Sequence, residues 1–346
     1  MSTLLDRHDV LLVDLDGTLY RGATVVPGAA EAMRAAQGRG VSTVYVTNNA
    51  SRRPAEVAAH LADLGFPATE RDVVASSQAA AAMLAEQLPA GAAVLVVGTD
   101  ALAEEIVAVG LSVTGEAGQA EAVVQGHSTQ TAWPVLAEAT VALRAGAVWV
   151  ACNVDATLPT ERGPLPGNGS MVAALRTASG REPQVAGKPA PALLHEGVRR
   201  AGARAPLMIG DRLDTDIEGG RAAGMATLLV LTGVSDATEL LAAPPALRPD
   251  LIGADLSALA VPADGLAPGP RPGWAVRRVG PEELELSGDG DEVDALRVLC
   301  AAHWADGGGV LRVTAADRGA AAALAALGLS STVNEADPTD PAGAAR

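Results

Sequence analysis

Short apolar runs alternate along the chain with longer segments of helical periodicity. The runs are rich in Val, Leu and Ile and lie at 10–13, 41–46, 93–97, 122–125, 147–151, 206–209 and 226–231. Runs of this length between turn signals predict buried strands of a parallel sheet. Helical segments are expected between them at 28–39, 54–64, 78–87, 101–109 and 132–145. Strand and helix joined by short links predict a doubly wound α/β fold with right-handed crossovers.

The rhythm of these elements divides the chain. A second strand–helix series predicts an inserted α/β domain at 83–182, which splits a core domain into 1–82 and 183–262. Residues 153–169 are expected to form a long loop, with Ser170 as the N-cap of a helix through 178. Residues 250–252 are expected at a sheet edge, and 263–273 form a Pro- and Gly-rich linker. A small α/β module (strand, helix, strand, helix) follows at 274–333, and 334–346 is expected to be disordered.

Composition and charge restrict the possible partners. Only 2% of the 346 residues are aromatic, so the core must consist of Ala, Val and Leu, and the formal charge is -16. A protein this acidic is not a general nucleic-acid binder and does not favour an anionic membrane surface. No run approaches the ~20 apolar residues of a membrane span, and no signal peptide is evident. We therefore expect a cytoplasmic protein, in which Cys152 and Cys300 are buried, reduced thiols.

Two carboxylates end the first apolar run. Asp14 and Asp16 follow the strand directly, at the end where doubly wound sheets bind ligands. Asp14 can act as a nucleophile, and Asp16 can pass a proton to a leaving group and take one from water. Gly17 allows a sharp turn and a close approach to a ligand. The alternative is a strand that ends in a solvated acidic turn.

Two further strand ends and one loop add polar groups. Thr47 follows the run at 41–46, and its hydroxyl with the amide of Asn48 can hold phosphate oxygens, although such threonines often only cap turns. Lys188 precedes a helix, where its ammonium suits a phosphate; a solvated surface lysine is the alternative. Residues 180–188 do not have the spacing of a P-loop.

The strand at 206–209 is followed by three carboxylates, Asp211, Asp214 and Asp216. Carboxylates crowded at a strand end are costly unless a cation neutralises them. Oxygen ligands without His or Cys favour Mg²⁺ over zinc. The alternative is an acidic N-cap of the next helix.

The four motifs DLDGT, TNN, GKP and GDRLDTD, in this order, resemble those of the haloacid dehalogenase-like phosphatases. The extended forms DLDGTLYRG and VTNNASR, with a long insert after the second motif, are similar to the class IIA, NagD-like branch. The resemblance implies a core with an inserted cap of the C2 type and a phosphoaspartyl intermediate. It also implies a small phosphorylated metabolite as substrate. One oligomeric state that it allows is a homodimer formed through the cap.

The resemblance implies a role for each matching position. Asp14 is the nucleophile and Asp16 is the general acid/base. Both ligate Mg²⁺ together with Asp211, Asp16 through its backbone carbonyl. Lys188 balances the phosphate charge. Thr47, Asn48 and Asn49 contact the phosphoryl oxygens. Asp216, and with it Asp214, orients Lys188 or a metal-bound water. Asp16 itself favours phosphoryl transfer, because the dehalogenases of the family have no acid there.

The insert carries the branch's N-x-D…P…G pattern at 153–169. Asp155, Thr157 and Arg162 are candidates for leaving-group contacts, unless this loop only caps a helix. One departure is Ser128, which stands where the branch has an Asp after its valine run.

The sequence leaves two questions open, the identity of the substrate and the role of the C-terminal module. Within this branch the chain resembles the glycerol 3-phosphate phosphatase type of mycobacteria, which also carries an acetyltransferase-like tail. Glycerol 3-phosphate, released by glycerophospholipid recycling, is therefore the first choice, with phosphoglycolate, a sugar phosphate or a nucleotide as alternatives. Residues 310–329 resemble the last strand and helix of GNAT acetyltransferases, but no pyrophosphate-binding loop is present. We expect a packing or regulatory module; an acyl-CoA-binding regulatory protein is the alternative of another class.

Overall fold

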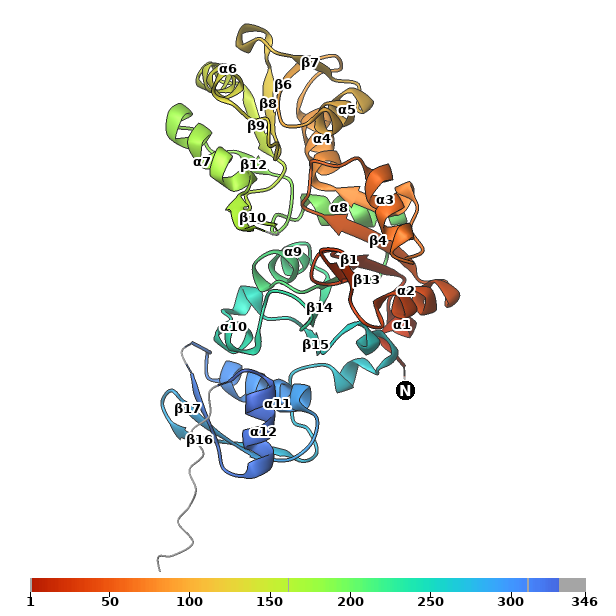
Figure 1. The fold of residues 1–346 in the computed structure, drawn as a ribbon, viewed down its shortest axis with the longest axis vertical. Helices are drawn as coiled ribbons and strands as arrows, with labels where there is room; N and C mark the ends of the chain where they lie inside the picture. Colours follow the sequence, from red (N-terminus) through yellow and green to blue (C-terminus); the bar gives the residue numbers. More distant parts are fainter. Residues whose placement is uncertain (1, 161, 310, 330–346) are drawn as a thin grey trace, which may run out of the picture.

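The computed structural model describes residues 2–160, 162–309 and 311–329, which form three parts stacked along the longest axis (Figure 1). The core lies in the middle and carries the N-terminus. The cap lies above it in this view, and the C-terminal module lies below. The predicted tail at 334–346 falls outside the described residues.

The core is built on one six-stranded sheet in which all neighbouring strands are parallel. Its order is β15-β14-β13-β1-β4-β5, so the chain adds strands on one side of β1 and later returns to add strands on the other. A reversal of this kind leaves a crevice at the carboxyl ends of the central strands. The strands are β1 (Val10–Val13), β4 (Ser42–Thr47), β5 (Val73–Ala75), β13 (Pro206–Gly210), β14 (Ala226–Val230) and β15 (Leu251–Gly253).

Helices cover both faces of this sheet, as a doubly wound fold requires. One buried cluster joins the sheet to α1 (Leu4–Arg7), α2 (Ala29–Gly38) and α3 (Pro54–Asp63). A second cluster on the other face joins it to α4 (Ser76–Gln87) and α8 (Ala192–Ala201). The remaining core elements are η1 (Glu70–Asp72), the π-helical turn η3 (Leu213–Ile217), α9 (Glu218–Ala222), α10 (Ala237–Ala242), η4 (Pro245–Leu247), η5 (Leu256–Ala260) and η6 (Ala263–Gly265).

The cap is a second parallel sheet, of five strands in the order β12-β9-β8-β6-β7. The chain enters it through α4, so a boundary at residue 83 falls inside a helix. The last strand, β12, still pairs with β9, although the sequence analysis expected this segment in the core. The cap elements are β6 (Ala93–Val97), α5 (Asp100–Ala108), β7 (Ser112–Thr114), η2 (Ala117–Gln119), β8 (Ala122–Gln125), α6 (Trp133–Arg144), β9 (Val148–Ala151), α7 (Asn168–Ser179) and β12 (Gln184–Val185).

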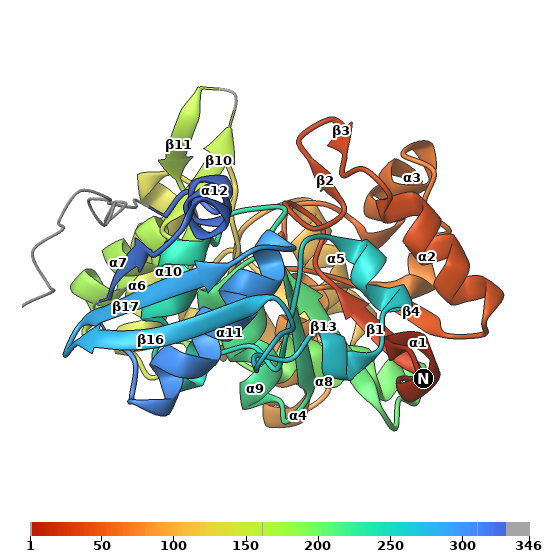
Figure 2. The ribbon, with the colours of Figure 1, turned by 90° about the horizontal axis from the view of Figure 1, so that it is seen from below.

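Two hairpins were not predicted. The first, β2 (Tyr20–Arg21) with β3 (Thr24–Val25), follows the acidic turn after β1. The second, β10 (Thr157–Thr160) with β11 (Gly163–Pro166), occupies the segment expected to be a loop. Prolines suppress a strand signal, but an isolated two-stranded hairpin tolerates them because few ladder bonds are needed. Both hairpins project on the same side of the molecule (Figure 2).

The helix after this second hairpin begins earlier than predicted. It starts at Asn168 with Gly167 as N-cap, so the prediction that Ser170 is the N-cap was wrong. The Ser170 hydroxyl instead donates to the Ala156 carbonyl at 2.8 Å. A Cβ on Gly167 would lie 2.3 Å from the Asp155 carbonyl oxygen, so a tight turn that needs glycine sets the helix start.

The C-terminal module has one strand more than predicted. Its sheet contains β16 (Trp274–Gly280), β17 (Glu283–Gly288) and β18 (Arg312–Ala315), covered by α11 (Glu292–Ala305) and α12 (Arg318–Ala326). The missed strand, β17, alternates Glu and Leu, and its leucines are buried while its glutamates are not. The module and the core share one buried cluster, which contains Leu229 and Ile252 of the core and Leu296 and Leu299 of α11.

Two further expectations concern single features. Both cysteines are free and buried, which confirms the prediction for Cys152 and Cys300. No helix within the described ranges is both long and apolar enough to span a bilayer.

Candidate active site

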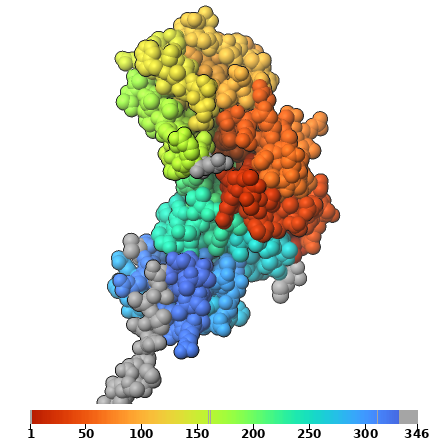
Figure 3. Space-filling view, in the orientation of Figure 1, coloured from red at the N-terminus to blue at the C-terminus, as the bar shows by residue number. Residues whose placement is uncertain are grey.

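The predicted motifs meet at the carboxyl edge of the core sheet. Asp14 follows β1, which lies between β4 and β13. Thr47 ends β4, and Asp211 follows β13. Because the carboxyl ends of parallel strands share one edge, three residues far apart in sequence become neighbours. In Figure 3 the surface is hollowed between the green part of the cap and the teal part of the core.

Lys188 is the buried cation of this edge. Its Nζ donates to Asp14 Oδ1 at 2.5 Å and to Asp216 Oδ1 at 2.7 Å, and its side chain is 2% exposed. The loop between β12 and α8 carries it. Asn48 holds that loop, because its Oδ1 accepts from the Lys188 amide at 2.8 Å and its Nδ2 donates to the Lys188 carbonyl at 2.9 Å.

Asp216 is satisfied on both oxygens. Oδ1 receives the Lys188 ammonium, and Oδ2 accepts from the amides of Asp211 and Arg212, each at 3.1 Å. The π-helical turn η3 turns this side chain back toward β13, as π-turns often do at functional sites. Asp214, on the same turn, faces outward and forms a two-bond ion pair with Arg212.

Asp211 is fully buried, and backbone groups hold its carboxylate. Oδ2 accepts from the Val234 amide at 2.7 Å, and the Thr18 hydroxyl donates to Oδ1 at 3.3 Å. A Cβ at Gly17 would lie 2.3 Å from Oδ2, and one at Gly233 would lie 1.8 Å away. Glycine is therefore required at both positions for the chain to approach this carboxylate.

The site carries excess negative charge. Burial raises the pKa of Asp14, Lys188 lowers it, and Asp216 and Asp211 raise it again, so that the resulting pKa is about 8. Burial, together with Asp216, raises the pKa of Asp211 to about 6. Burial by itself would lower the pKa of Lys188, but the carboxylates Asp14 and Asp216 keep it above its usual value. One ammonium does not neutralise three carboxylates, so the site favours a further cation.

The donor set fits a hard divalent cation. Carboxylate oxygens of Asp14, Asp211 and Asp216 lie within 4.8 Å of one another. Asp216 already accepts three hydrogen bonds, so the oxygens open to a metal are those of Asp14 and Asp211. Within the described ranges no hydrogen bond reaches the Asp16 carbonyl oxygen, and its carboxylate is exposed. Oxygen-only ligands of this kind suit Mg²⁺.

The predicted phosphate contacts after β4 have local partners. Thr47 Oγ1 accepts from the Asn49 amide at 3.1 Å, and its hydroxyl proton is still available to a ligand. Asn49 Oδ1 accepts from the amide and hydroxyl of Ser51, and the Asn48 side chain is engaged by the Lys188 loop. A ligand contact from Asn48 must therefore come from its backbone amide, which none of the hydrogen bonds found in the described residues uses.

The cap contributes Asp155, which lies beside Asn48 of the core. Asn48 Nδ2 lies 3.4 Å from both Asp155 carboxylate oxygens, and burial raises the pKa of Asp155. Asn153 fixes the same segment, since its Nδ2 donates to the Asn48 carbonyl at 2.7 Å. Thr157 and Arg162 are exposed on the β10–β11 hairpin, and Arg162 joins no site residue through the hydrogen bonds and ion pairs of the described residues. The structure thus brings Asp155 to the site but not Arg162.

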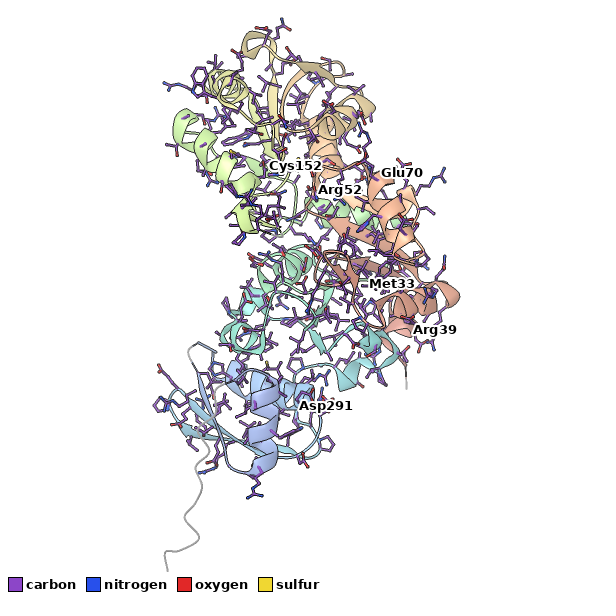
Figure 4. All side chains as sticks on the ribbon, in the orientation of Figure 1. Met33, Arg39, Arg52, Glu70, Cys152 and Asp291 are labelled. Carbon is purple, nitrogen blue, oxygen red and sulfur yellow. The ribbon has the colours of Figure 1, made fainter. Side chains whose placement is uncertain are left out.

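Three groups near the site were not predicted. Arg52 is exposed at the junction of core and cap (Figure 4), and its charge acts on the Tyr20 hydroxyl together with those of Asp16 and Asp14. Val234 and Ser235 bind Asp211 from the loop after β14. The sequence signal was the Gly-Val-Ser-Asp stretch after a predicted strand, because this strand ends at the same edge of the sheet.

Comparisons with known proteins agree with this geometry. The haloacid dehalogenase-like hydrolase family matches residues 11–112, and the HAD-hydrolase-like family matches residues 185–259. The GCN5-related N-acetyltransferase like domain matches residues 271–329.

Individual relatives extend the similarity to most of the chain. D-glycerol 3-phosphate phosphatase of Mycobacterium tuberculosis is 54% identical over 300 residues, which cover 86% of this chain and 84% of that protein. The 5'-nucleotidase YutF of Bacillus subtilis is 40% identical over 65% of this chain and 87% of its own length. A crystal structure of the M. tuberculosis glycerol phosphate phosphatase in complex with magnesium superposes with a TM-score of 0.89 at 51% identity, covering 95% of this chain and all of that one. The chain therefore belongs to the haloacid dehalogenase-like hydrolase family.

Proposed function

We propose that this protein is a Mg²⁺-dependent phosphatase of small phosphate monoesters and that glycerol 3-phosphate is its substrate. The observation that carries the proposal is the buried Lys188 ammonium between Asp14 and Asp216, with the Asp211 carboxylate beside them. This arrangement offers one nucleophilic carboxylate next to a fixed positive charge.

The proposed reaction has two steps. Asp14 attacks phosphorus, the bond to the ester oxygen breaks, and Asp16 gives its proton to the departing alkoxide. In the second step Asp16 takes a proton from water, whose oxygen attacks the phosphorus of the phosphoaspartyl group. The P–O bond to Asp14 then breaks, which releases phosphate and restores the Asp14 carboxylate and the protonated Asp16.

Asp14, Asp211 and the carbonyl of Asp16 would hold Mg²⁺, which supplies positive charge to the phosphoryl oxygens when bound. Uncatalysed monoester hydrolysis is among the slowest reactions, with enzymatic accelerations up to about 10²¹-fold, of which one general acid supplies about 10²–10⁴. Positioning and electrostatic stabilisation must supply most of the rest. Lys188 contributes to this from the protein.

Further residues are proposed for binding and orientation. The Thr47 hydroxyl and the Asn48 amide would hold phosphoryl oxygens, and Asn49 would support their loop. Asp155 is proposed to contact the leaving group, and Arg162 would do so only after the β10–β11 hairpin moves toward the core. Asp216 and Asp214 are proposed to position Lys188 and Arg212.

The choice of glycerol 3-phosphate rests on the similarity to the M. tuberculosis relative, a D-glycerol 3-phosphate phosphatase. Phosphoglycolate, a sugar phosphate or a nucleotide are the alternatives, and the nucleotidase among the relatives supports the last of these. The proposed parts are a core, a cap, a linker (263–273) and a C-terminal module (274–333), with the cap sheet extending past the predicted end at residue 182 to β12.

The experiment is a screen of phosphate monoesters for phosphate release, with Mg²⁺ and with EDTA. We expect turnover of glycerol 3-phosphate with Mg²⁺ only, and its loss in Asp14→Asn. Asp63→Asn, a change of an exposed carboxylate on α3, is the matched control and should keep full activity. Turnover by Asp14→Asn at the wild-type rate would refute the assignment.

We also propose that two copies associate through the cap. Val107 on α5 and Val113 on the edge strand β7 are 58% and 45% exposed and line a shallow apolar groove. An unpaired edge strand beside apolar side chains is a common pairing surface. Light scattering should show a dimer that Val113→Lys dissociates and Val141→Lys on α6 does not; a monomeric wild type would exclude this proposal.

We also propose a cytoplasmic location, because both cysteines are free thiols.

A further inference from the structure

The loop between β14 and α10 holds Asp211 at two points and the turn that follows Asp211 at a third. The Val234 amide donates to Asp211 Oδ2 at 2.7 Å, and the Ser235 amide donates to the Asp211 carbonyl at 3.0 Å. The buried Ser235 hydroxyl accepts from the Leu213 amide at 3.0 Å. The orientation of the Asp211 carboxylate therefore depends on where this loop lies.

The loop runs directly into α10, so the position of α10 sets the position of the loop. Asp236 is its N-cap, with the side chain accepting from the Glu239 amide at 2.8 Å. A helix of six residues is not stable alone, because helix nucleation costs more than so few hydrogen bonds return. What fixes α10 must be the elements packed against it.

The C-terminal module holds the other end of α10. Trp304 on α11 donates its indole N–H to the Leu241 carbonyl at 3.3 Å. Arg248 donates to the Ala243 carbonyl at 3.0 Å and to the Gly307 carbonyl of the module at 2.7 Å. Its guanidinium also lies over the Trp304 ring, 5.2 Å from the ring centre. Trp304 and Arg248 thus tie the last carbonyls of α10 to the module.

Buried contacts reinforce these bonds. Leu240 and Leu241 of α10 lie in one apolar cluster with Leu296 and Leu299 of α11. Arg297, 7% exposed, donates to the Ile252 carbonyl of the edge strand β15 at 3.0 and 2.6 Å. The module therefore packs on two neighbouring core elements, and Figure 1 shows α11 directly below α10 and β15.

We propose that the C-terminal module positions the metal ligand Asp211 by holding α10 and, through it, the Val234–Ser235 loop. Trp304 and Arg248 are the positioning residues. The proposal rests on the function proposed above, since it takes Asp211 as a Mg²⁺ ligand. It gives the module a role in the phosphatase reaction that needs no ligand of its own.

The test compares Mg²⁺ binding by calorimetry in full-length variants. Removing a group that directly orients a metal ligand typically changes metal affinity about 10–100-fold. Trp304 and Arg248 act on Asp211 indirectly, through α10 and the loop before it. We therefore expect Trp304→Phe and Arg248→Gln to bind Mg²⁺ about threefold to tenfold more weakly. The Mg²⁺ concentration for half-maximal turnover should rise equally, with the KM for substrate unchanged.

Trp274→Phe is the matched control. It also removes an indole N–H that donates to a carbonyl, that of Asp291 at 3.1 Å, but this bond lies within the module. We expect wild-type Mg²⁺ affinity for it, even where thermal unfolding shows the same loss of stability as Trp304→Phe. If Trp304→Phe does not fold, Arg248→Gln carries the comparison.

The outcomes separate the two proposals. Wild-type Mg²⁺ affinity in both Trp304→Phe and Arg248→Gln, or equal weakening in Trp274→Phe, would overturn the positioning role and leave the phosphatase assignment intact. A wild-type protein that binds no Mg²⁺ and releases no phosphate would overturn the phosphatase assignment itself.

Discussion

Asp14→Asn is expected to abolish turnover and, in EDTA, to stabilise the fold. Loss of a nucleophile lowers kcat by about 10⁴-fold or more. The gain in stability follows from electrostatics, because the substitution removes one of three carboxylates that crowd a single ammonium. A residue that destabilises the fold and is needed for activity is typical of an active site.

The magnitude follows from the pKa of Asp14, which burial and its neighbours raise from 3.8 to about 8. At about 1.4 kcal/mol per pKa unit, keeping this group in the metal-free fold at pH 7 costs about 4 kcal/mol relative to the unfolded chain. At pH 7 Asn offers Lys188 a neutral acceptor, as the mostly protonated Asp14 does, and imperfect placement of its amide group removes about 1–2 kcal/mol. The net gain is about 2–3 kcal/mol, or about 3–4 °C in Tm for a chain of 346 residues.

The assay is thermal unfolding followed by circular dichroism at pH 7, with EDTA and then with Mg²⁺. Asp16→Asn is the matched control: this exposed carboxylate should change stability by less than about 0.5 kcal/mol, while kcat falls about 10²–10⁴-fold. Mg²⁺ should stabilise the wild type more than Asp14→Asn. If Asp14→Asn unfolds at a lower temperature than the wild type in EDTA, the reasoning about excess negative charge is refuted.

The remaining predictions concern pH, Asp216 and Arg52. In EDTA the folded protein keeps protons on Asp14 and Asp211, whose pKa values are raised, whereas the unfolded chain releases these protons above about pH 4. The Tm should therefore fall as the pH rises from 5 to 8. A Tm that does not change with pH would contradict this. Asp216→Asn should lower the free energy of unfolding by about 3–5 kcal/mol, because this carboxylate accepts three hydrogen bonds in a buried ion pair. The exposed Asp214→Asn should lower it by at most about 1 kcal/mol. Equal losses of stability in denaturant unfolding would contradict this difference. Arg52→Gln should raise KM about threefold to tenfold and weaken its dependence on ionic strength, since an exposed cation at the site attracts a dianion. Arg39→Gln, on the outer surface, should change neither, and an unchanged KM in the Arg52 variant would remove it from the site.

The sequence predicts the core of the site because its geometry follows from strand ends alone. Asp14, Thr47 and Asp211 each follow an apolar run, and a parallel sheet brings such positions to one edge whatever their spacing in the chain. The doubly wound fold was predicted for the same reason. Lys188 lies in a loop, and its place depends on the two hydrogen bonds that Asn48 makes with its backbone, which no local pattern encodes.

Where the sequence prediction was wrong, long-range contacts decided the structure. The β10–β11 hairpin forms from a Pro- and Gly-rich stretch, and the start of α7 is set by the close approach of Gly167 to Asp155. Neither contact has a periodic signature. The alternation of β17 was present in the sequence. The pairing of Arg277 with Glu285 across the β16–β17 ladder can be predicted only when the register of the two strands is known.

The C-terminal module shows how packing can decide between two interpretations that similarity leaves open. A module that serves to bind its own ligand would close its own apolar core and be joined to the enzyme by a linker and a polar interface. Here Leu229 and Ile252 of the core sheet share one buried cluster with Leu296 and Leu299 of the module, and the buried Arg297 caps a carbonyl of the edge strand. Separation of the two parts would expose apolar surface on both and break the two hydrogen bonds between Arg297 and the Ile252 carbonyl, which is costly. The module is thus part of the structure that supports the catalytic edge of the sheet, and this favours a packing role over an independent acyl-CoA-binding role.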